Sequence, residues 1–185
     1  MGELSRHMRG IETGVAHVLQ RLPDLPVQDV MLLRMLKLTN EGLSARFLHL
    51  LKPHGLNESD FRVLMQLYSS PNGSGFPGEL CTFVVQTPTN MTRIADVLVA
   101  RGLVTRRPSD EDRRRIALHI TPAGRRFVGK LMPQLFPVLR DSFSVLDERE
   151  KRQLHRLLER VITQLDVGGS GAGSRQPARA SPRAD

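Results

Sequence analysis

The chain has 185 residues, a formal net charge of +8, 39% hydrophobic residues and 25% charged residues. This length and composition are typical of a soluble globular protein, with one domain or a small domain plus an arm. The sequence contains no run of about 18 apolar residues, which excludes a transmembrane helix, and its first twenty residues lack the apolar segment of a secretory signal.

Cysteine and histidine usage argues against several kinds of chemistry. Cys81 is the only cysteine, so an internal disulfide framework is excluded and a reducing, cytoplasmic location is expected. The six histidines show no metal-ligand spacing, and no nucleophile elbow, phosphate loop or dinucleotide fingerprint appears in the sequence. We therefore expect no enzyme activity, no metal site and no cofactor. The basic residues are arginine more than lysine, which suits bidentate contacts with phosphates or base edges.

Helical periodicity dominates the first part of the chain. Residues 27–55 carry apolar side chains at helical intervals, and Gly55 is the expected end of this long helix. Asn57 is the expected N-cap of a second helix, with Asp60 at its N3 position in a variant of the capping box. On this second helix one apolar face is predicted, made by Phe61, Leu64, Met65 and Tyr68.

The next segment predicts two further helices. A Pro/Gly-rich loop at 70–78 leads into a short, weak helix ending near residue 86. A much stronger helix follows, in which Thr87 is the cap, Pro88 takes the first helical position and Gly102 lies just after the end.

The last part of the chain predicts a hairpin and two more helices. Two short runs at 103–108 and 116–120 are rich in strand-forming Val, Ile and Thr and flank a polar tip. Pro122 opens a helix that runs to about residue 145, and the prolines at 133 and 137 should kink or break it. Asp147 then caps a final helix whose leucines form a stripe of nearly coiled-coil character.

This order of elements is that of a winged helix-turn-helix. The predicted fold class is mainly α, an α+β winged helix-turn-helix with a helical region and a winged DNA-binding domain that carries a two-stranded hairpin. The predicted organisation is an N-terminal extension (1–26), a helical region (27–56 and 122–166), a winged domain (57–121) and a disordered basic tail (167–185). Whether the extension forms a helix that packs on the rest of the protein is left open.

The strong helix after Thr87 has the pattern of a DNA-recognition helix. Its apolar residues recur at helical intervals and should face the core: Met91, Ile94, Ala95 and Leu98. The side chains left exposed near its start are suited to bases and phosphates: Thr89, Asn90, Thr92 and Arg93. Capping alone would also explain Thr87 and Asn90. We favour capping for Thr87, which is kept as a DNA-contact candidate, and DNA contact for Asn90 and Arg93.

Positive charge is concentrated around this helix and the hairpin. Residues 86–126 hold nine arginines and four acidic residues, which is a net charge of +5 out of the chain's +8. Concentrated charge of this kind indicates a surface for a polyanion, whose binding should weaken steeply with salt. Three consecutive acidic residues interrupt it at the hairpin tip: Asp110, Glu111 and Asp112.

The segment "MTRIADVLVARGLVTRRPSDEDRRRIALHITPAG" closely resembles the recognition helix and wing of the MarR family of bacterial regulators. The similarity runs from about Val27 to Asp166. It implies a homodimer, with residues 27–56 and 122–166 as the helical dimerisation region, that binds double-stranded DNA at a pseudo-palindromic operator. It also implies that Arg114 enters the minor groove, oriented by Asp96 and Asp112. The remaining arginines expected to contact DNA are Arg106, Arg113 and Arg115.

The resemblance also implies an effector. Small aromatic or phenolic anions, or hydrophobic drugs, would bind between the dimerisation helices and the winged domain and release a repressor from DNA, with a multidrug-efflux operon as the expected target. The candidates to line such a pocket are Met35, Arg46, Phe47, His49, Met65 and Tyr68. Ordinary core packing would explain most of them equally well.

Two other functions remain open at this point. Some MarR-type regulators sense oxidants through a cysteine, and Cys81 could serve that purpose, although no cationic cluster adjoins it to lower its pKa. Alternatively, the winged helix could be a protein-interaction module that does not read DNA. The basic recognition helix and wing argue against this module.

Overall fold

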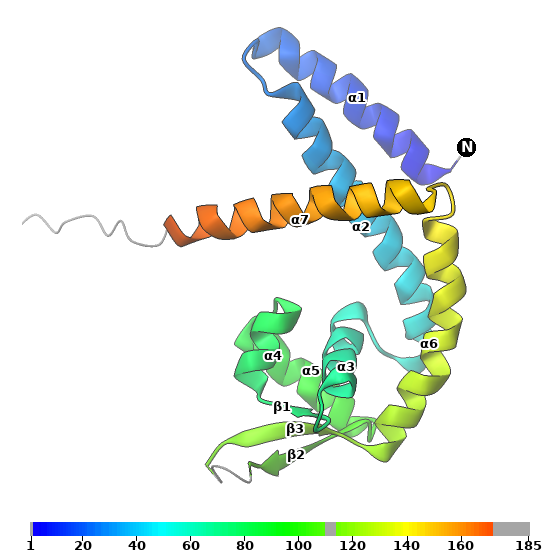
Figure 1. Cartoon of the computed structure of the whole chain (residues 1–185), viewed down its shortest axis with the longest axis vertical. Helices are drawn as coiled ribbons and strands as arrows, with labels where there is room; N and C mark the ends of the chain where they lie inside the picture. Colours follow the sequence, from blue (N-terminus) through cyan, green and yellow to red (C-terminus); the bar gives the residue numbers. More distant parts are fainter. Residues whose placement is uncertain (1, 110–113, 172–185) are drawn as a thin grey trace, which may run out of the picture. The chain divides into compact units, whose positions relative to one another are not determined.

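The computed structural model describes residues 2–109 and 114–171, except for the side chains of residues 167–171. The elements in chain order are α1 (Glu3–Arg21), α2 (Val27–Leu51), the 3-10 turn η1 (Lys52–His54), α3 (Glu58–Ser69), β1 (Ser74–Gly75), α4 (Pro77–Val84), α5 (Pro88–Ala100), β2 (Val104–Pro108), β3 (Ile116–Ile120), α6 (Pro122–Ser142) and α7 (Glu148–Gly171) (Figure 1). The chain forms two compact units, Met1–Leu139 and Arg140–Asp185. None of the described helices is long and apolar enough to cross a membrane.

The predicted fold class is confirmed, with one correction to the sheet. Strands β2 and β3 pair as the expected antiparallel hairpin, with Val104 opposite Ile120 and Pro108 opposite Ile116. A third strand, β1, adds to the other edge of β3, so the order is β1-β3-β2 and not a two-stranded hairpin. This strand was missed because two residues inside a Pro/Gly-rich segment show no alternating pattern, and only their pairing with β3 makes them a strand.

The core lies where α3, α4 and α5 pack together and against the sheet. Its fully buried members include Leu64 and Leu67 of α3, Leu80 of α4, Leu98 of α5 and Leu118 of β3. Helix α3 packs a wider face inward than the sequence predicts. Of the four predicted residues, Leu64 is fully buried, Phe61 and Met65 are partly buried against the core and Tyr68 is exposed. Val63 and Leu67 are buried in addition.

The helices outside the winged domain add to the predicted organisation and in part correct it. The N-terminal extension, whose structure the sequence leaves open, forms helix α1, which packs against α2. Helix α6 continues through Pro133 and Pro137, so of the predicted kink or break, the break does not occur. Helix α7 runs to Gly171, beyond residue 166, where the tail was expected to begin. The rest of that predicted tail lies outside the described residues.

The segment "TPAG" joins the wing to α6 by close backbone packing. The hydroxyl of Thr121 accepts a hydrogen bond from the backbone N–H of Gly124 (2.9 Å) and donates one to the carbonyl of Gly102 (2.7 Å). A Cβ on Gly124 would lie 2.2 Å from the Leu103 carbonyl oxygen and 2.8 Å from Ile120 Cγ1. Because a backbone atom is the obstacle, only glycine fits at this position.

Replacing Gly124 with alanine is therefore expected to lower the free energy of unfolding by about 1–3 kcal/mol, the usual cost of overpacking. Gly129→Ala on the same helix is the matched control, since a Cβ there meets nothing within 4 Å. The control should stabilise the protein by about 0.5–1 kcal/mol through helix propensity. Urea denaturation of both variants measures the two opposite signs, and equal shifts would contradict the packing argument.

Candidate nucleic-acid interface

Helix α5 presents the residues that the sequence predicts on each of its faces. Thr87 caps the helix, since its hydroxyl accepts a hydrogen bond from the backbone N–H of Asn90 (3.2 Å). The predicted core face is confirmed, because the buried residues of α5 are Met91, Ile94, Ala95 and Leu98. Thr89, Thr92 and Arg93 are exposed and Asn90 is half-buried. The first two turns of α5 therefore offer hydroxyl, amide and guanidinium groups to solvent.

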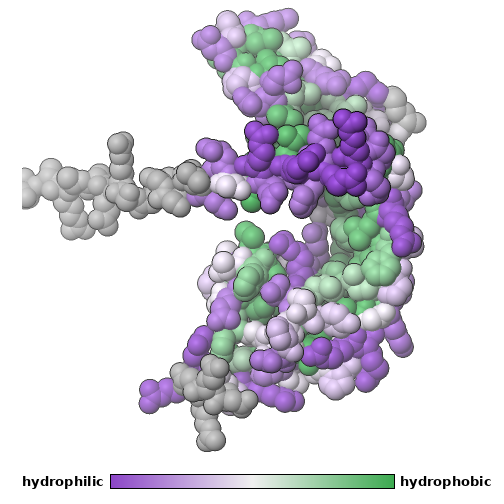
Figure 2. All heavy atoms as spheres, in the orientation of Figure 1, coloured by the Kyte–Doolittle hydropathy of each residue, from purple (hydrophilic) through white to green (hydrophobic). Residues whose placement is uncertain are grey.

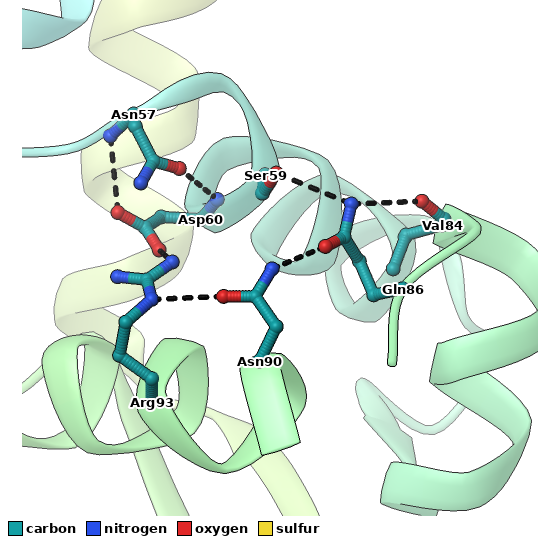
Figure 3. A network of polar contacts seen from close by, with 7 residues as sticks. All are labelled: Asn57, Ser59, Asp60, Val84, Gln86, Asn90 and Arg93. Atoms are coloured by element: carbon teal, nitrogen blue, oxygen red, sulfur yellow. Dashed lines mark hydrogen bonds and ion pairs between the residues drawn. The ribbon is translucent and has the colours of Figure 1, made fainter. Parts of the chain in front are cut away.

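A polar network links the start of α5 to the start of α3 (Figure 3). Arg93 Nη2 lies 3.0 Å from Asp60 Oδ1, and Arg93 Nε donates to Asn90 Oδ1 (2.9 Å). The amide of Asn90 donates to the side-chain oxygen of Gln86. The amide of Gln86 in turn donates to Ser59 Oγ (3.3 Å).

The centre of this network is a buried carboxylate. The side chain of Asp60 is 3% exposed, and its second oxygen accepts the backbone N–H of Asn57 (3.0 Å). With the reciprocal bond from the Asp60 N–H to Asn57 Oδ1 (2.9 Å), this completes the predicted capping box. A buried carboxylate is costly unless charge-assisted hydrogen bonds compensate it, so Asp60 requires a cationic partner.

Arg93 combines two environments, which affects the role that the sequence predicts for it. Its side chain is 45% exposed although one edge of the guanidinium, at Nε and Nη2, is held by Asn90 and Asp60. A guanidinium has five N–H donors, so donors remain for a further acceptor. The direct DNA contact expected of Asn90 and Arg93 stays a prediction, and the structure adds that both are held in place from behind. The pairing of Arg93 with Asp60 has no signal in the sequence, because 33 residues separate the two.

The wing is tied to α5 by an ion pair. Arg106 Nη2 on β2 lies 2.7 Å from Asp96 Oδ1 on α5, with the two side chains 39% and 61% exposed. The sequence predicts that Asp96 orients Arg114, whereas in the structure Asp96 holds Arg106. Asp96 therefore positions a wing arginine on strand β2, and its orienting effect on Arg114 stays a prediction.

The far strand of the wing is held by a second arginine. Arg115 lies with its guanidinium carbon 3.8 Å from the centroid of the Phe76 ring and with Nη2 3.8 Å from Glu79 Oε1. Its carbonyl accepts the backbone N–H of Ser109 (2.8 Å), which closes the base of the tip. Phe76 and Glu79 were missed from the sequence because they come from the loop and helix before α5.

The tip itself lies partly outside the described residues. Arg113 and Asp112, and with them Asp110 and Glu111, fall in that gap. Arg114 is described and exposed. Its expected insertion into the minor groove stays a prediction.

Of the six candidate effector residues, only Met65 lines one of the three described pockets. Met65 lines a small pocket of about 250 Å³ between α3 and α4, together with Phe61 and Phe83. Phe47 and Met65 pack against the hydrophobic core, as ordinary core residues would. Arg46 and His49 are exposed, and Met35 and Tyr68 are each 39% exposed. Cys81 lines a different pocket, of about 650 Å³, formed with Pro88, Met91, Asp96 and Arg106.

A helix with short polar side chains at its exposed start, packed on two further helices and flanked by an arginine-bearing wing, defines a winged helix-turn-helix protein. Residues 54–115 match the MarR family model. The chain is 36% identical over 146 residues to the transcriptional repressor MprA of Escherichia coli strain K12, which covers 79% of this chain and 83% of MprA. It therefore belongs to the MarR family.

Other relatives and solved structures agree with this assignment. The HTH-type transcriptional regulator PrsX of Escherichia coli is 26% identical over 156 residues, or 84% of this chain and 94% of PrsX. A crystal structure of a mutant MarR from E. coli complexed with operator DNA superposes with a TM-score of 0.67 at 23% identity, covering 75% of this chain and 98% of that one. AbsC, a MarR family transcriptional regulator from Streptomyces coelicolor, gives 0.66 at 22% identity, covering 72% and 90%. At these identities the structures support the fold alone.

Proposed function

We propose that this protein is a homodimeric transcriptional repressor that binds a pseudo-palindromic operator in double-stranded DNA. Small aromatic, phenolic or drug-like ligands release it from that operator, and its targets are multidrug-efflux genes. In each subunit α5 lies in the major groove and the wing contacts the flanking minor groove and phosphates. MprA is described as a transcriptional repressor, which supports the repressor part of the proposal.

The observation that carries the proposal is the way in which α5 and the wing are held. Arg93 is fixed from behind by the buried Asp60, and Arg106 is fixed by Asp96, while Thr89, Thr92 and Arg93 on the outward face of α5 are exposed. Side chains positioned in this way lose little conformational entropy when they bind, which favours recognition of a rigid partner such as a DNA duplex. A net charge of +5 over residues 86–126 supplies the attraction to phosphate.

The test is binding to a fluorescent duplex from the intergenic DNA upstream of the gene, measured by anisotropy between about 50 and 200 mM salt. Each phosphate contact contributes about −0.9 to the slope of log affinity against log salt concentration. About six contacts in the complex therefore give a slope steeper than about −5. Sequence-specific binding should survive an excess of unrelated duplex. A shallow slope, or equal affinity for both duplexes, would instead favour a protein-interaction module.

The proposed release from DNA by small ligands is tested separately. Salicylate-like compounds added to the preformed complex should lower the anisotropy in a concentration-dependent way, since a ligand that prefers the non-binding dimer shifts the population. Release by peroxide that is abolished in Cys81→Ser, without release by salicylate, would identify an oxidant sensor instead. Neither outcome of the release experiment changes what the salt dependence and the competition with unrelated duplex say about DNA binding.

Asp96→Ala is expected to weaken operator binding by about three- to ten-fold, because Arg106 loses the carboxylate that orients it. The direction of the change in operator affinity distinguishes positioning from charge. Removing an acidic residue reduces the repulsion of phosphate, so by charge alone the affinity should rise, whereas loss of positioning lowers it. Glu12→Ala on α1 removes the same charge and is the control, for which unchanged or slightly tighter binding is expected. If Asp96→Ala behaves like this control in the anisotropy assay, the positioning role is wrong.

A further inference from the structure

The helical hairpin of α1 and α2 contains a pocket of about 750 Å³ that the proposed repressor function does not use. The two helices run antiparallel beside one another and are joined by a short turn (Figure 1). The pocket is lined from both helices and from the turn, so it belongs entirely to the first unit of the chain. Its volume falls within the range of pockets that hold small organic ligands.

The lining of this pocket combines apolar and cationic side chains. Around the turn it is apolar, with Val18 at the end of α1, Leu25 in the turn and Val30 at the start of α2. Figure 2 shows an apolar patch at this end of the hairpin, bordered by hydrophilic side chains. Away from the turn the lining is mixed: its apolar members are Ile11, Val15 and Leu38, and its cations Arg6, Arg34 and Lys37 outnumber the single acid Glu41.

These cations have no ion-pair partner within the described part of the chain. Its described ion pairs involve Arg93, Arg106, Arg115 and Lys151, and none includes Arg6, Arg34 or Lys37. Three cationic side chains around one pocket therefore gain from an added anion. A ligand that satisfies both ends has an apolar body and one anionic head group.

Two glycines line the pocket from one side. Gly10 and Gly14 lie in the middle of α1, where glycine weakens a helix relative to alanine. Tight packing does not require them, since both are exposed and a Cβ at either position would meet nothing within 4 Å. In contrast, a Cβ on Gly42 of α2 would lie 2.8 Å from Leu4 Cδ1, so close helix packing explains that glycine. Larger side chains at positions 10 and 14 therefore have room to extend over the pocket.

We propose that the pocket between α1 and α2 binds an amphipathic organic anion, with its apolar body against Val18, Leu25 and Val30 and its carboxylate or sulfonate against Arg6, Arg34 and Lys37. This site is separate from α5 and the wing. Its binding is measured on the full chain without DNA, so the result is independent of the proposed DNA-binding role.

The probe is 8-anilinonaphthalene-1-sulfonate, whose fluorescence rises in an apolar site, with octanoate and 1-octanol as competitors of equal chain length. Octanoate should displace the dye about five-fold more strongly than 1-octanol, because only octanoate carries the anion. The double variant Gly10→Leu/Gly14→Leu should weaken dye binding at least about ten-fold by filling the pocket. Arg34→Gln/Lys37→Gln should weaken octanoate competition and leave 1-octanol competition unchanged.

Gly10→Ala/Gly14→Ala is the matched control, since it adds little volume and strengthens the helix. Its dye affinity should stay within about two-fold of the unsubstituted protein. Thermal unfolding by circular dichroism confirms that all variants are folded. Dye binding that is unchanged in the leucine variant would overturn the proposal. A shift of the monomer–dimer equilibrium in that variant without loss of dye binding would make the groove an interface between chain copies, which also overturns it.

Discussion

Asp60→Ala is expected to lower the free energy of unfolding by about 2–4 kcal/mol and to weaken operator binding about ten-fold. The stability loss has two sources in the structure, namely the capping bond to the Asn57 N–H and the pair with Arg93. The binding loss follows because Arg93 loses the carboxylate that positions it, and the hydrogen bond from Arg93 to Asn90 is one of the contacts that position Asn90. Urea denaturation and fluorescence anisotropy measure the two effects.

Asp60→Asn separates capping from charge. The amide oxygen of asparagine can still accept the Asn57 N–H, but the charge that holds Arg93 is lost. This variant should retain most of the capping contribution and still bind the operator more weakly than the unsubstituted protein. If it binds as tightly as the unsubstituted protein, Asp60 acts only as a helix cap and the positioning of α5 depends on other contacts.

Val161→Glu is expected to raise the dissociation constant of the proposed dimer by at least about 100-fold. The affinity for the operator should fall by a similar factor. The apolar stripe of α7 is exposed in the single chain, where Leu157, Val161 and Leu165 are 46%, 47% and 68% exposed. Burying an unpaired carboxylate in an apolar interface costs several kcal/mol. A monomer contacts one half-site only and loses the gain of bivalent binding.

Thr163→Glu is the matched control because it adds the same charge to the polar face of α7, opposite the stripe at helical spacing. Sedimentation velocity should show a monomer for Val161→Glu and a dimer for Thr163→Glu. If both variants stay dimeric and bind the operator equally, the stripe on α7 is not the dimer interface.

Helix starts and the buried face of α5 were predicted correctly because both depend on residues close in the sequence. The caps at Asn57, Thr87 and Asp147 act over two or three residues, and all three are present in the structure. The core face of α5 follows from helical periodicity alone. The face of α3 was predicted less well, since what it packs against decides which of its several apolar residues become buried.

The candidate nucleic-acid interface formed by α5 and the wing also has features set by residues close in the sequence and features set by tertiary packing. The sequence by itself determined which side chains point outward at the start of α5 and that arginines gather in the wing. Only the tertiary structure decided that β1 joins the sheet, that Arg93 pairs with Asp60, and that Asp96 holds Arg106. The physical reason is that capping and periodicity act within one or two helical turns. Ion pairs and strand pairing join residues whose proximity depends on how the whole core packs.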